Sequence, residues 1–287
     1  MKLITAIVGF VMMPGLGAQN AFADEIKPWQ IWHQESASEF ASRIFWFDLY
    51  TLYFIVPIML FVLALLLFVM VRFRAGANPV ASKTSHNSLI EAAWTILPII
   101  ILVAMALPSF SLLKYQMVPT EEPALTLKAT GYQWYWGYEY QDEAPLSFDS
   151  VMLQEAERDA AGKLDKSAYP RLLAVDNEVV VPVGKMVRVI ITAADVLHAF
   201  TVPALGFKMD AVPGRLNETW FKAEREGLYY GQCSELCGRD HAFMPIAIRV
   251  VSEARYSAWK TAAATDLKGA NKALMAAVAG KINVAGN

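Results

Sequence analysis

A short loop near the end of the chain gathers several side chains that bind soft metal ions. Residues 231–244 read GQCSELCGRDHAFM and hold both cysteines of the chain, Cys233 and Cys237, together with His241 and Met244. Thiolate, thioether and imidazole form the ligand set that favours copper, and zinc fits less well because methionine is a poor zinc ligand. If the loop faces an oxidising compartment, the two cysteines alone would instead predict a disulfide. The loop therefore predicts a copper site or a disulfide.

The number of soft ligands indicates how many copper ions the loop could hold. A mononuclear blue-copper site uses one cysteine, two histidines and a weak methionine, whereas this loop has two cysteines four residues apart. Two thiolates can bridge two copper ions, each of which then needs a terminal imidazole. Besides His241, the candidate is His198 in AADVLHAFTVP, because His33 precedes the first long apolar run and His86 follows it. His198 comes directly after a predicted strand, where the end loops of a β-sandwich can meet.

Two long uncharged runs, residues 49–71 and 92–113, predict membrane-spanning helices. About 20 apolar residues in a helix cross the ~30 Å core of a bilayer, and proline is tolerated inside such helices. Residues 1–23 have an early lysine, a broken apolar run and an Ala-Phe-Ala ending, which is the pattern of a signal peptide. A retained anchor is the alternative for this segment.

The charges beside the two runs predict their orientation. The linker between them carries Arg72, Arg74 and Lys83 against only Glu91, whereas residues 24–48 carry five acids and two bases. Positively charged loops stay in the cytoplasm. We therefore expect residues 24–120 to contain a hairpin with both ends on the outer side of the membrane, in agreement with the signal peptide.

The sequence changes from long apolar runs to short alternating segments at about residue 121. MVRVIIT (residues 186–192) and IAIRV (residues 246–250) each place alternate aliphatic residues on one face, and such strands separated by Pro/Gly turns predict a β-sandwich or barrel over residues 121–255. Residues 154–170 form a polar excursion, and residues 256–287 an Ala-rich tail of no readable purpose. The fold class is membrane-anchored α+β, a two-helix transmembrane hairpin followed by an all-β sandwich.

Charge and composition restrict the partners. The formal net charge of −2 gives no reason to expect a nucleic-acid partner, and 55% hydrophobic against 18% charged residues is high for a soluble protein. Residues 121–255 carry 20 acids and 14 bases, a net charge of −6. This excess is either a solvated face or a patch that steers a basic partner. The chain has no C-x-x-C-H motif for a fused c-type haem.

Several motifs in order resemble one known family. The signal peptide, the two apolar helices, GYQWYWGYEY, DVLHAF, KMDAVPGR and the final C-x3-C-x3-H-x2-M are together similar to subunit II of cytochrome c oxidase, closest to bacterial aa3-type members. The resemblance covers roughly residues 40–255. It implies a cupredoxin-like outer domain that carries a dinuclear copper centre, CuA.

The resemblance also implies a role for each residue of the copper motif. The cysteines match the two bridging thiolates, the histidines the terminal ligands, the methionine a weak axial ligand, and Glu235 a backbone carbonyl ligand. These residues are His198, Cys233, Glu235, Cys237, His241 and Met244. The Glu235 side chain would also bind a magnesium ion shared with subunit I.

Further residues match family positions outside the copper motif. Trp134 corresponds to the exposed tryptophan where electrons enter from cytochrome c, whereas Trp136, two residues along the same predicted face, is expected in the core. Docking acids for cytochrome c are implied at Glu139, Asp149, Asp176 and Asp195. Glu91 matches the mouth of a proton channel, with a favourable acid at a helix N-terminus as its plainer alternative. Asp210 and Arg215 match polar residues at the subunit I interface.

The implied activity is that of an oxidase subunit. Electrons from cytochrome c would pass through this chain to the haem groups of subunit I, where oxygen reduction is coupled to proton pumping, so no oxygen-reducing residue is expected here. Three alternatives remain: a quinol-oxidase subunit, which lacks the copper ligands; a periplasmic copper chaperone; and a structural protein with a plain disulfide.

Overall fold

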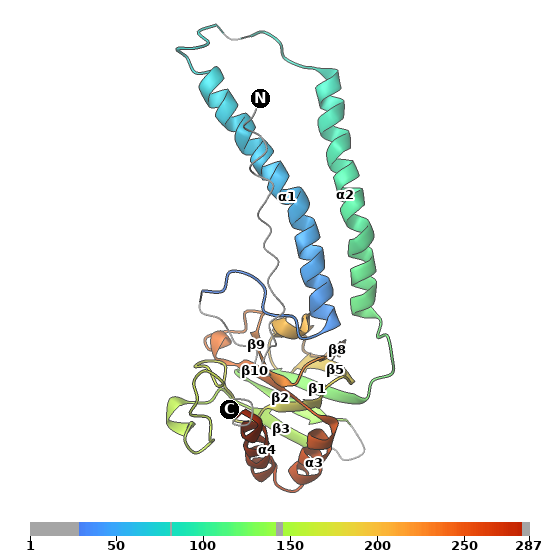
Figure 1. The fold of residues 1–287 in the computed structure, drawn as a ribbon, viewed down its shortest axis with the longest axis vertical. Helices are drawn as coiled ribbons and strands as arrows, with labels where there is room; N and C mark the ends of the chain where they lie inside the picture. The colour runs from blue at the N-terminus through green and yellow to red at the C-terminus, as the bar shows by residue number, and fades with distance from the viewer. Residues whose placement is uncertain (1–28, 81, 142–145, 283–287) are drawn as a thin grey trace.

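The computed structural model describes residues 29–80, 82–141 and 146–282 of the chain. The signal peptide predicted at residues 1–23 lies outside these ranges. Two long helices extend from one side of a β-domain, and their connecting loop lies at the end remote from that domain (Figure 1). Two further helices, near the C-terminus, pack on the opposite side of the β-domain.

The long helices α1 (Glu39–Arg72) and α2 (Ser88–Met117) extend beyond the apolar runs that predicted them. Polar residues determine where they begin. The Ser38 side chain accepts a hydrogen bond from the backbone N–H of Ala41, and the Asn87 side chain accepts from two backbone N–H groups at the start of α2. These caps satisfy donors that have no partner within the helix. Both helices therefore begin at a polar cap before their apolar segment.

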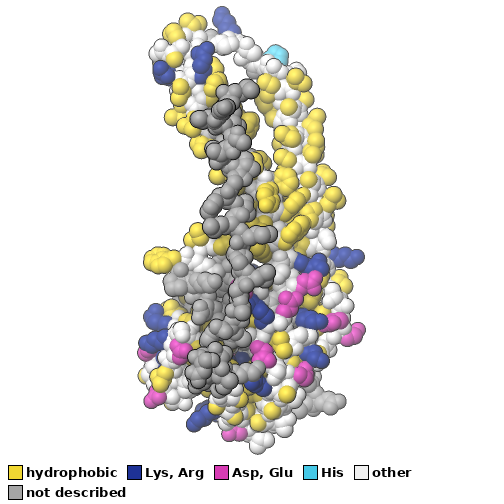
Figure 2. All heavy atoms as spheres, viewed as in Figure 1, with side chains coloured by type: hydrophobic (Ala, Val, Ile, Leu, Met, Phe, Trp, Pro, Cys, Tyr) yellow, Lys and Arg dark blue, Asp and Glu magenta, His cyan; other side chains and the backbone are white. Residues whose placement is uncertain are grey.

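The apolar segments of both helices are long enough to cross a bilayer, and their side chains are not buried inside the protein. Apolar side chains dominate the surface of the hairpin, whereas charges of both signs dominate the β-domain (Figure 2). Within the chain, the Tyr50 hydroxyl donates to the Ala104 carbonyl at 3.1 Å and joins the two helices. The hairpin predicted from the sequence is confirmed as two membrane-spanning helices.

The β-domain is a sandwich of two five-stranded sheets, one ordered β3-β2-β1-β5-β8 and the other β4-β10-β9-β6-β7. The strands are β1 (Leu125–Tyr132), β2 (Tyr135–Tyr140), β3 (Leu146–Ser150), β4 (Val179–Pro182), β5 (Met186–Ala193), β6 (His198–Val202), β7 (Phe207–Ala211), β8 (Asn217–Lys222), β9 (Gly227–Cys233) and β10 (Pro245–Val251). Short 3-10 turns lie at Glu155–Glu157 (η1), Pro203–Leu205 (η2) and His241–Phe243 (η3). The β-sandwich predicted for this region is confirmed.

The two strands with alternating aliphatic residues, β5 and β10, differ in whether their second face is buried. In β5, Val187, Val189 and Ile191 are buried and the residues between them are partly exposed, as the alternation predicts. In β10 all seven residues are buried. The expectation that β10 has one outward face is therefore wrong, and its Arg249 lies beneath other parts of the chain.

The C-terminal tail is one of the parts that cover the sandwich. It forms α3 (Glu253–Ala263) and α4 (Leu267–Ile282), so residue 255 falls inside a helix. The Trp259 ring lies 5.7 Å from the Tyr140 ring, and its indole N–H donates to Asn271 at 2.8 Å. Trp259 and Leu274 are buried in the same core as the strands. The tail is thus an integral layer of the domain.

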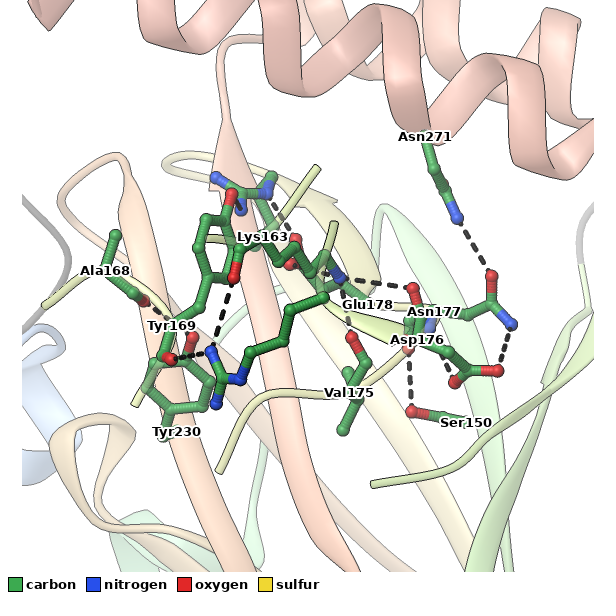
Figure 3. A network of polar contacts seen from close by, with 12 residues as sticks. Ser150, Lys163, Ala168, Tyr169, Val175, Asp176, Asn177, Glu178, Tyr230 and Asn271 are labelled. Carbon is green, nitrogen blue, oxygen red and sulfur yellow. Dashed lines mark hydrogen bonds and ion pairs between the residues drawn. The ribbon is translucent and has the colours of Figure 1, made fainter. Parts of the chain in front are cut away.

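The polar excursion forms the other covering part, around a buried ionic network (Figure 3). The Glu178 carboxylate is paired with the Arg249 guanidinium and, at 2.9 Å, with the Lys163 ammonium. Lys163 also donates to the Val175 carbonyl at 2.7 Å, and Arg249 donates to the Tyr169 hydroxyl at 3.1 Å. Charges this deeply buried persist because each is paired and hydrogen-bonded.

The base of α1 packs directly on the β-domain. The Ala37 N–H donates to the Ala204 carbonyl at 2.8 Å, and the Ser38 hydroxyl donates to the Leu205 carbonyl at 2.8 Å. Gly206 has φ +83°, and a Cβ there would lie 2.6 Å from the backbone nitrogen of Ala41. Only glycine allows both this backbone conformation and this close approach.

Candidate metal centre

Two neighbouring strands bring the soft side chains together. His198 is the first residue of β6 and Cys233 the last residue of β9, and these strands are antiparallel with Phe200 opposite Cys233. The loop after β9 contains Cys237 and η3, and it returns to β10 just after Met244. Residues separated by 35 positions in the chain therefore meet at one end of the sandwich.

The ligand atoms lie close together. The Sγ atoms of Cys233 and Cys237 are 3.9 Å apart and form no disulfide. His198 Nδ1 lies 3.8 Å from the Cys233 sulfur, and His241 Nδ1 lies 3.5 Å from the Cys237 sulfur. The Met244 sulfur lies 3.6 Å from the Cys237 sulfur. Each imidazole is thus next to a different thiol.

These separations fit metal coordination. Tetrahedral bonds of about 2.3 Å to sulfur and about 2.0 Å to nitrogen place neighbouring ligand atoms roughly 3.5–3.8 Å apart. One ligand atom from each of His198, Cys233 and Cys237 lies within 4.8 Å of the other two, and all three residues are buried. The softness of the set matches copper. The residues present therefore fit a copper centre without large rearrangement.

The orientation of His198 is set by two contacts on its far side. Its Nε2 lies 2.9 Å from a carboxylate oxygen of Asp195, which can accept a hydrogen bond from that nitrogen, and its Nδ1 therefore faces Cys233. A second Asp195 oxygen accepts from the Gln133 N–H at 2.7 Å. Gly131 lies against the ring, since a Cβ there would be 2.8 Å from His198 Cδ2. Asp195 and Gly131 thus hold the imidazole in one position, and Gln133 holds Asp195.

The two thiols differ in acidity. Burial raises the pKa of Cys233. Hydrogen bonds with His198 and with backbone groups of Glu235 and Ala199 lower it by more than burial raises it, so the pKa of this thiol falls below its usual range. Burial, and then the neighbouring Cys233, raises the pKa of Cys237 above the usual range. Two adjacent buried thiolates repel each other, so holding both ionised requires a cation between them.

The tryptophan-rich hairpin between β1 and β2 supports the loop from one side. Gln133 Nε2 and Trp134 Nε1 donate to the Cys237 carbonyl at 2.8 and 3.2 Å. Trp136 Nε1 donates to the Met244 carbonyl at 3.3 Å. Trp136 is fully buried, as predicted. The expectation that Trp134 shares its face is wrong, because Trp134 lies in the turn and is partly exposed.

Further supporting residues escaped the sequence analysis. Gly131, Gln133 and Arg239 showed no metal-binding signal, yet the first two contact ligand residues and the Arg239 guanidinium lies 5.4 Å from the Trp134 ring centroid. The sequence offered one signal for them: Gly131 and Gln133 belong to the motif GYQWYW, and Arg239 lies within the cysteine loop. Glu235 has its carbonyl 3.3 Å from the Cys233 sulfur, while its side chain is exposed.

The four acids expected at a docking surface occupy different settings. Asp195 is next to His198, whereas Glu139 on β2 pairs with Lys128 at 2.7 Å. Asp149 on β3 is exposed. Asp176 accepts from the Val151 N–H at 2.8 Å, which gives it a role in holding the turn. Only Asp195 lies directly beside the candidate metal centre.

The remaining predicted residues lie away from the ligands. Glu91 is exposed in the first turn of α2, at the end of the hairpin remote from the β-domain. Asp210, the next-to-last residue of β7, is exposed, and its backbone carbonyl accepts a hydrogen bond from the Asn217 side chain at 2.7 Å. Arg215 is exposed in the loop that follows.

Fold and ligand arrangement together define a membrane-anchored β-sandwich protein with a site suited to a soft metal. Comparison with known proteins then identifies the family. Residues 125–251 match the family described as cytochrome c oxidase subunit II, periplasmic domain, and residues 26–112 match its transmembrane domain.

Individual relatives agree. A probable cytochrome c oxidase subunit 2 of Rickettsia felis is 49% identical over 259 residues, which cover 90% of this chain and 78% of the relative. Cytochrome c oxidase subunit 2 of Cereibacter sphaeroides is 49% identical over 238 residues, covering 79% of this chain and 78% of the relative. A crystal structure of the periplasmic domain of subunit II of cytochrome oxidase of Bradyrhizobium japonicum is 55% identical and covers 50% of this chain and 96% of that one, with a TM-score of 0.45.

The chain belongs to the cytochrome c oxidase subunit II family, as its motifs predicted. It is a membrane-anchored subunit of a haem-copper oxidase, and other oxidase subunits are therefore implied as its partners.

Proposed function

We propose that this chain holds two copper ions and relays single electrons from cytochrome c to subunit I. The thiolates of Cys233 and Cys237 and the imidazoles of His198 and His241 would hold the ions. Met244 and the Glu235 carbonyl would be the weak ligands. The observation that carries the proposal is the placement of each imidazole next to a different thiol, at 3.8 and 3.5 Å.

The protein's contribution would be a rigid and mostly dry setting for the ligands. The chemistry supplied by bound copper is one-electron transfer with little change in bond length. The hairpin residues Gln133, Trp134 and Trp136 hold the loop through its carbonyls, and Asp195 fixes His198. Cys233, Cys237 and Met244 are almost completely shielded from solvent. A fixed ligand set keeps the rearrangement on electron transfer small.

Electrons would enter through Trp134. Its ring is partly exposed in the hairpin turn, and its N–H donates to the carbonyl of the ligand residue Cys237 at 3.2 Å. The net charge of −6 over residues 121–255 would steer a basic cytochrome c toward this end. Asp195 lies closest, and Glu139, Asp149 and Asp176 would extend the docking surface. Oxygen reduction and proton pumping would take place in subunit I.

The family pattern suggests roles for four further residues. The exposed carboxylate of Glu235 would bind a magnesium ion shared with subunit I, and Asp210 and Arg215 would face that subunit. Glu91, at the remote end of the hairpin, would lie at the mouth of a proton channel. Arg72 and Arg74 lie near the same remote end, which supports a cytoplasmic linker and periplasmic termini in a bacterial inner membrane.

The test uses the full-length chain in detergent, reduced and then loaded with copper. We expect two copper ions per chain that share one unpaired electron, with a seven-line hyperfine pattern in electron paramagnetic resonance. One copper with a four-line pattern would favour a mononuclear site, and no copper with a Cys233–Cys237 disulfide would favour the chaperone or structural alternative. His241→Ala should lose the shared-electron signal, while the exposed Arg171→Ala should keep it.

A further inference from the structure

The segment before α1 folds back along the helix. Trp32 and Phe45 pack edge to face with ring centroids 6.1 Å apart, and His33 Nε2 lies 3.2 Å from an Asp48 carboxylate oxygen. Ser38 caps the helix, and Asp48 lies ten residues later, which corresponds to about 15 Å along the axis. Residues 32 and 33 therefore lie well along the helix, on the way toward the membrane-spanning part.

The contact level coincides with the expected membrane boundary. Asp48 is the last charged residue before the uncharged run from Leu49 to Val71. The apolar surface of the hairpin continues down to its base, where charged side chains of the β-domain begin (Figure 2). The His33–Asp48 pair thus marks the level at which the bilayer core gives way to the headgroups of the outer leaflet.

Large apolar side chains are exposed in the segment before α1 and beside it on α1. Trp29 is 97% exposed and Ile31 98%, while Trp32 and Trp46 are 46% and 57% exposed. Singly exposed apolar residues are common on protein surfaces, but a group of this size that continues a membrane-spanning surface indicates contact with a further apolar phase. Tryptophan in particular is enriched at membrane–water interfaces.

The charged side chains of the segment have partners within the protein. Glu35 pairs with Arg225 at 2.9 Å, and Glu39 pairs with Arg43 at 2.6 Å. His33 and Asp48 pair with each other. Among the described residues from Trp29 onward, the segment therefore has no unpaired basic side chain that would recognise anionic lipid. Its attraction to a membrane would come from the aromatic and aliphatic surface.

We propose that Trp29, Ile31 and Trp32, together with Trp46 on α1, form an interfacial foot that inserts into the headgroup region of the outer leaflet. The occupant of this surface is lipid, because it is continuous with the membrane-facing surface of α1. The foot limits vertical movement and tilt of α1 where the helix joins the β-domain. This inference rests on the membrane anchorage of the chain and is independent of copper binding.

Tryptophan fluorescence in vesicles tests the foot. The full-length chain is reconstituted in phosphatidylcholine vesicles with lipid brominated high on the acyl chain, and compared with the double variant W29F/W32F. Four tryptophans are exposed among the described residues, so the double variant should lose about half of the lipid-quenched fluorescence. Trp94→Phe, at the remote end of the hairpin, is the positive control and should lose about a quarter. Circular dichroism checks that each variant is folded.

Three results would overturn the proposal. The fluorescence lost in W29F/W32F could be quenched by aqueous iodide and not by brominated lipid, which would place the foot in water. Lipid quenching seen with the single chain could disappear in the purified oxidase complex, which would assign the surface to another subunit. Quenching could require anionic lipid, which would contradict attraction by apolar side chains. Quenching by brominated phosphatidylcholine, equal in chain and complex, supports the foot.

Discussion

Replacing Gly131 with alanine should displace a proposed copper ligand without touching the ligand itself. The new Cβ would lie 2.8 Å from His198 Cδ2 and 2.9 Å from Cγ. Carbon atoms prefer separations of about 3.5–4.0 Å, so one of the two residues must move by roughly 0.6 Å or more. His198 is fully buried, and Asp195 and β6 fix its far side. Neither His198 nor the backbone at residue 131 can therefore move away at low energetic cost.

The expected magnitude follows from this overpacking. Extra atoms in a packed core cost about 1–3 kcal/mol, and each kcal/mol lowers the melting temperature of a domain of this size by about 2–4 °C. The metal-free full-length chain carrying Gly131→Ala should therefore melt roughly 2–12 °C lower. Copper content and the electron paramagnetic resonance signal of the loaded chain should fall as well, because a ligand is misplaced.

Gly137→Ala in the same hairpin is the matched control. Its Cβ would lie 3.0 Å from Tyr132 Cε2 and 3.3 Å from an Asp149 oxygen. The Tyr132 side chain is partly exposed and Asp149 is exposed, so both can move. The gain in backbone stiffness from glycine to alanine is similar in the two variants and cancels. If Gly131→Ala melts at or above Gly137→Ala and binds copper fully, the argument from close approach is refuted.

Three further predictions concern the surroundings of the site. Asp195→Asn should lower copper affinity about 10–100-fold in a competition with a chelator, because a carboxylate no longer holds His198. Glu139→Gln, which alters a partly buried pair with Lys128 away from the ligands, should leave the copper affinity unchanged. Burial alone would raise the pKa of Glu178, but Arg249 and Lys163 lower it from 4.5 to about 2. The ionised Glu178 carboxylate therefore adds roughly 3 kcal/mol to the free energy of unfolding above pH ~4.5, and this stabilisation is lost as the pH falls toward ~2. Acid unfolding should show this loss in the parent chain and not in Glu178→Gln. Deleting residues 253–287 should lower the melting temperature, because buried Trp259 and Leu274 are lost, yet leave copper content intact; loss of copper would show that the tail supports the site.

The sequence predicted the elements whose signals are local. Uncharged runs of more than 20 residues predicted both long helices, and the alternation in β5 predicted its buried face, because each pattern reflects one environment along its whole length. The ligand candidates were recognisable for a similar reason, since four of them lie within a dozen residues. His198 required only the further inference that loops at one end of a sandwich meet.

The failures have different physical causes, and the first is coverage by distant parts of the chain. Arg249 sits in an alternating strand, and its burial depends on Lys163, Glu178 and residues of α4, all of which lie far from it in sequence. Trp134 was predicted to lie on a strand face, but the turn between β1 and β2 includes it. A shift of the turn by one residue along the sequence is enough to change this assignment. Gly131 and Gln133 have no chemistry of their own that marks a metal site. Their roles come from close approach and from hydrogen bonds to loop carbonyls.

The same distant contacts connect the membrane anchor to the candidate copper site. β6 begins at His198 and leads directly into η2, whose Ala204 and Leu205 carbonyls accept hydrogen bonds from the base of α1. Gly206 brings the two backbones into direct contact. Five residues, 199–203, therefore separate a proposed ligand from the first residue that contacts the base of α1. The electron relay proposed above would need its copper site at a fixed height relative to the bilayer, and this short connection would provide it without a flexible linker.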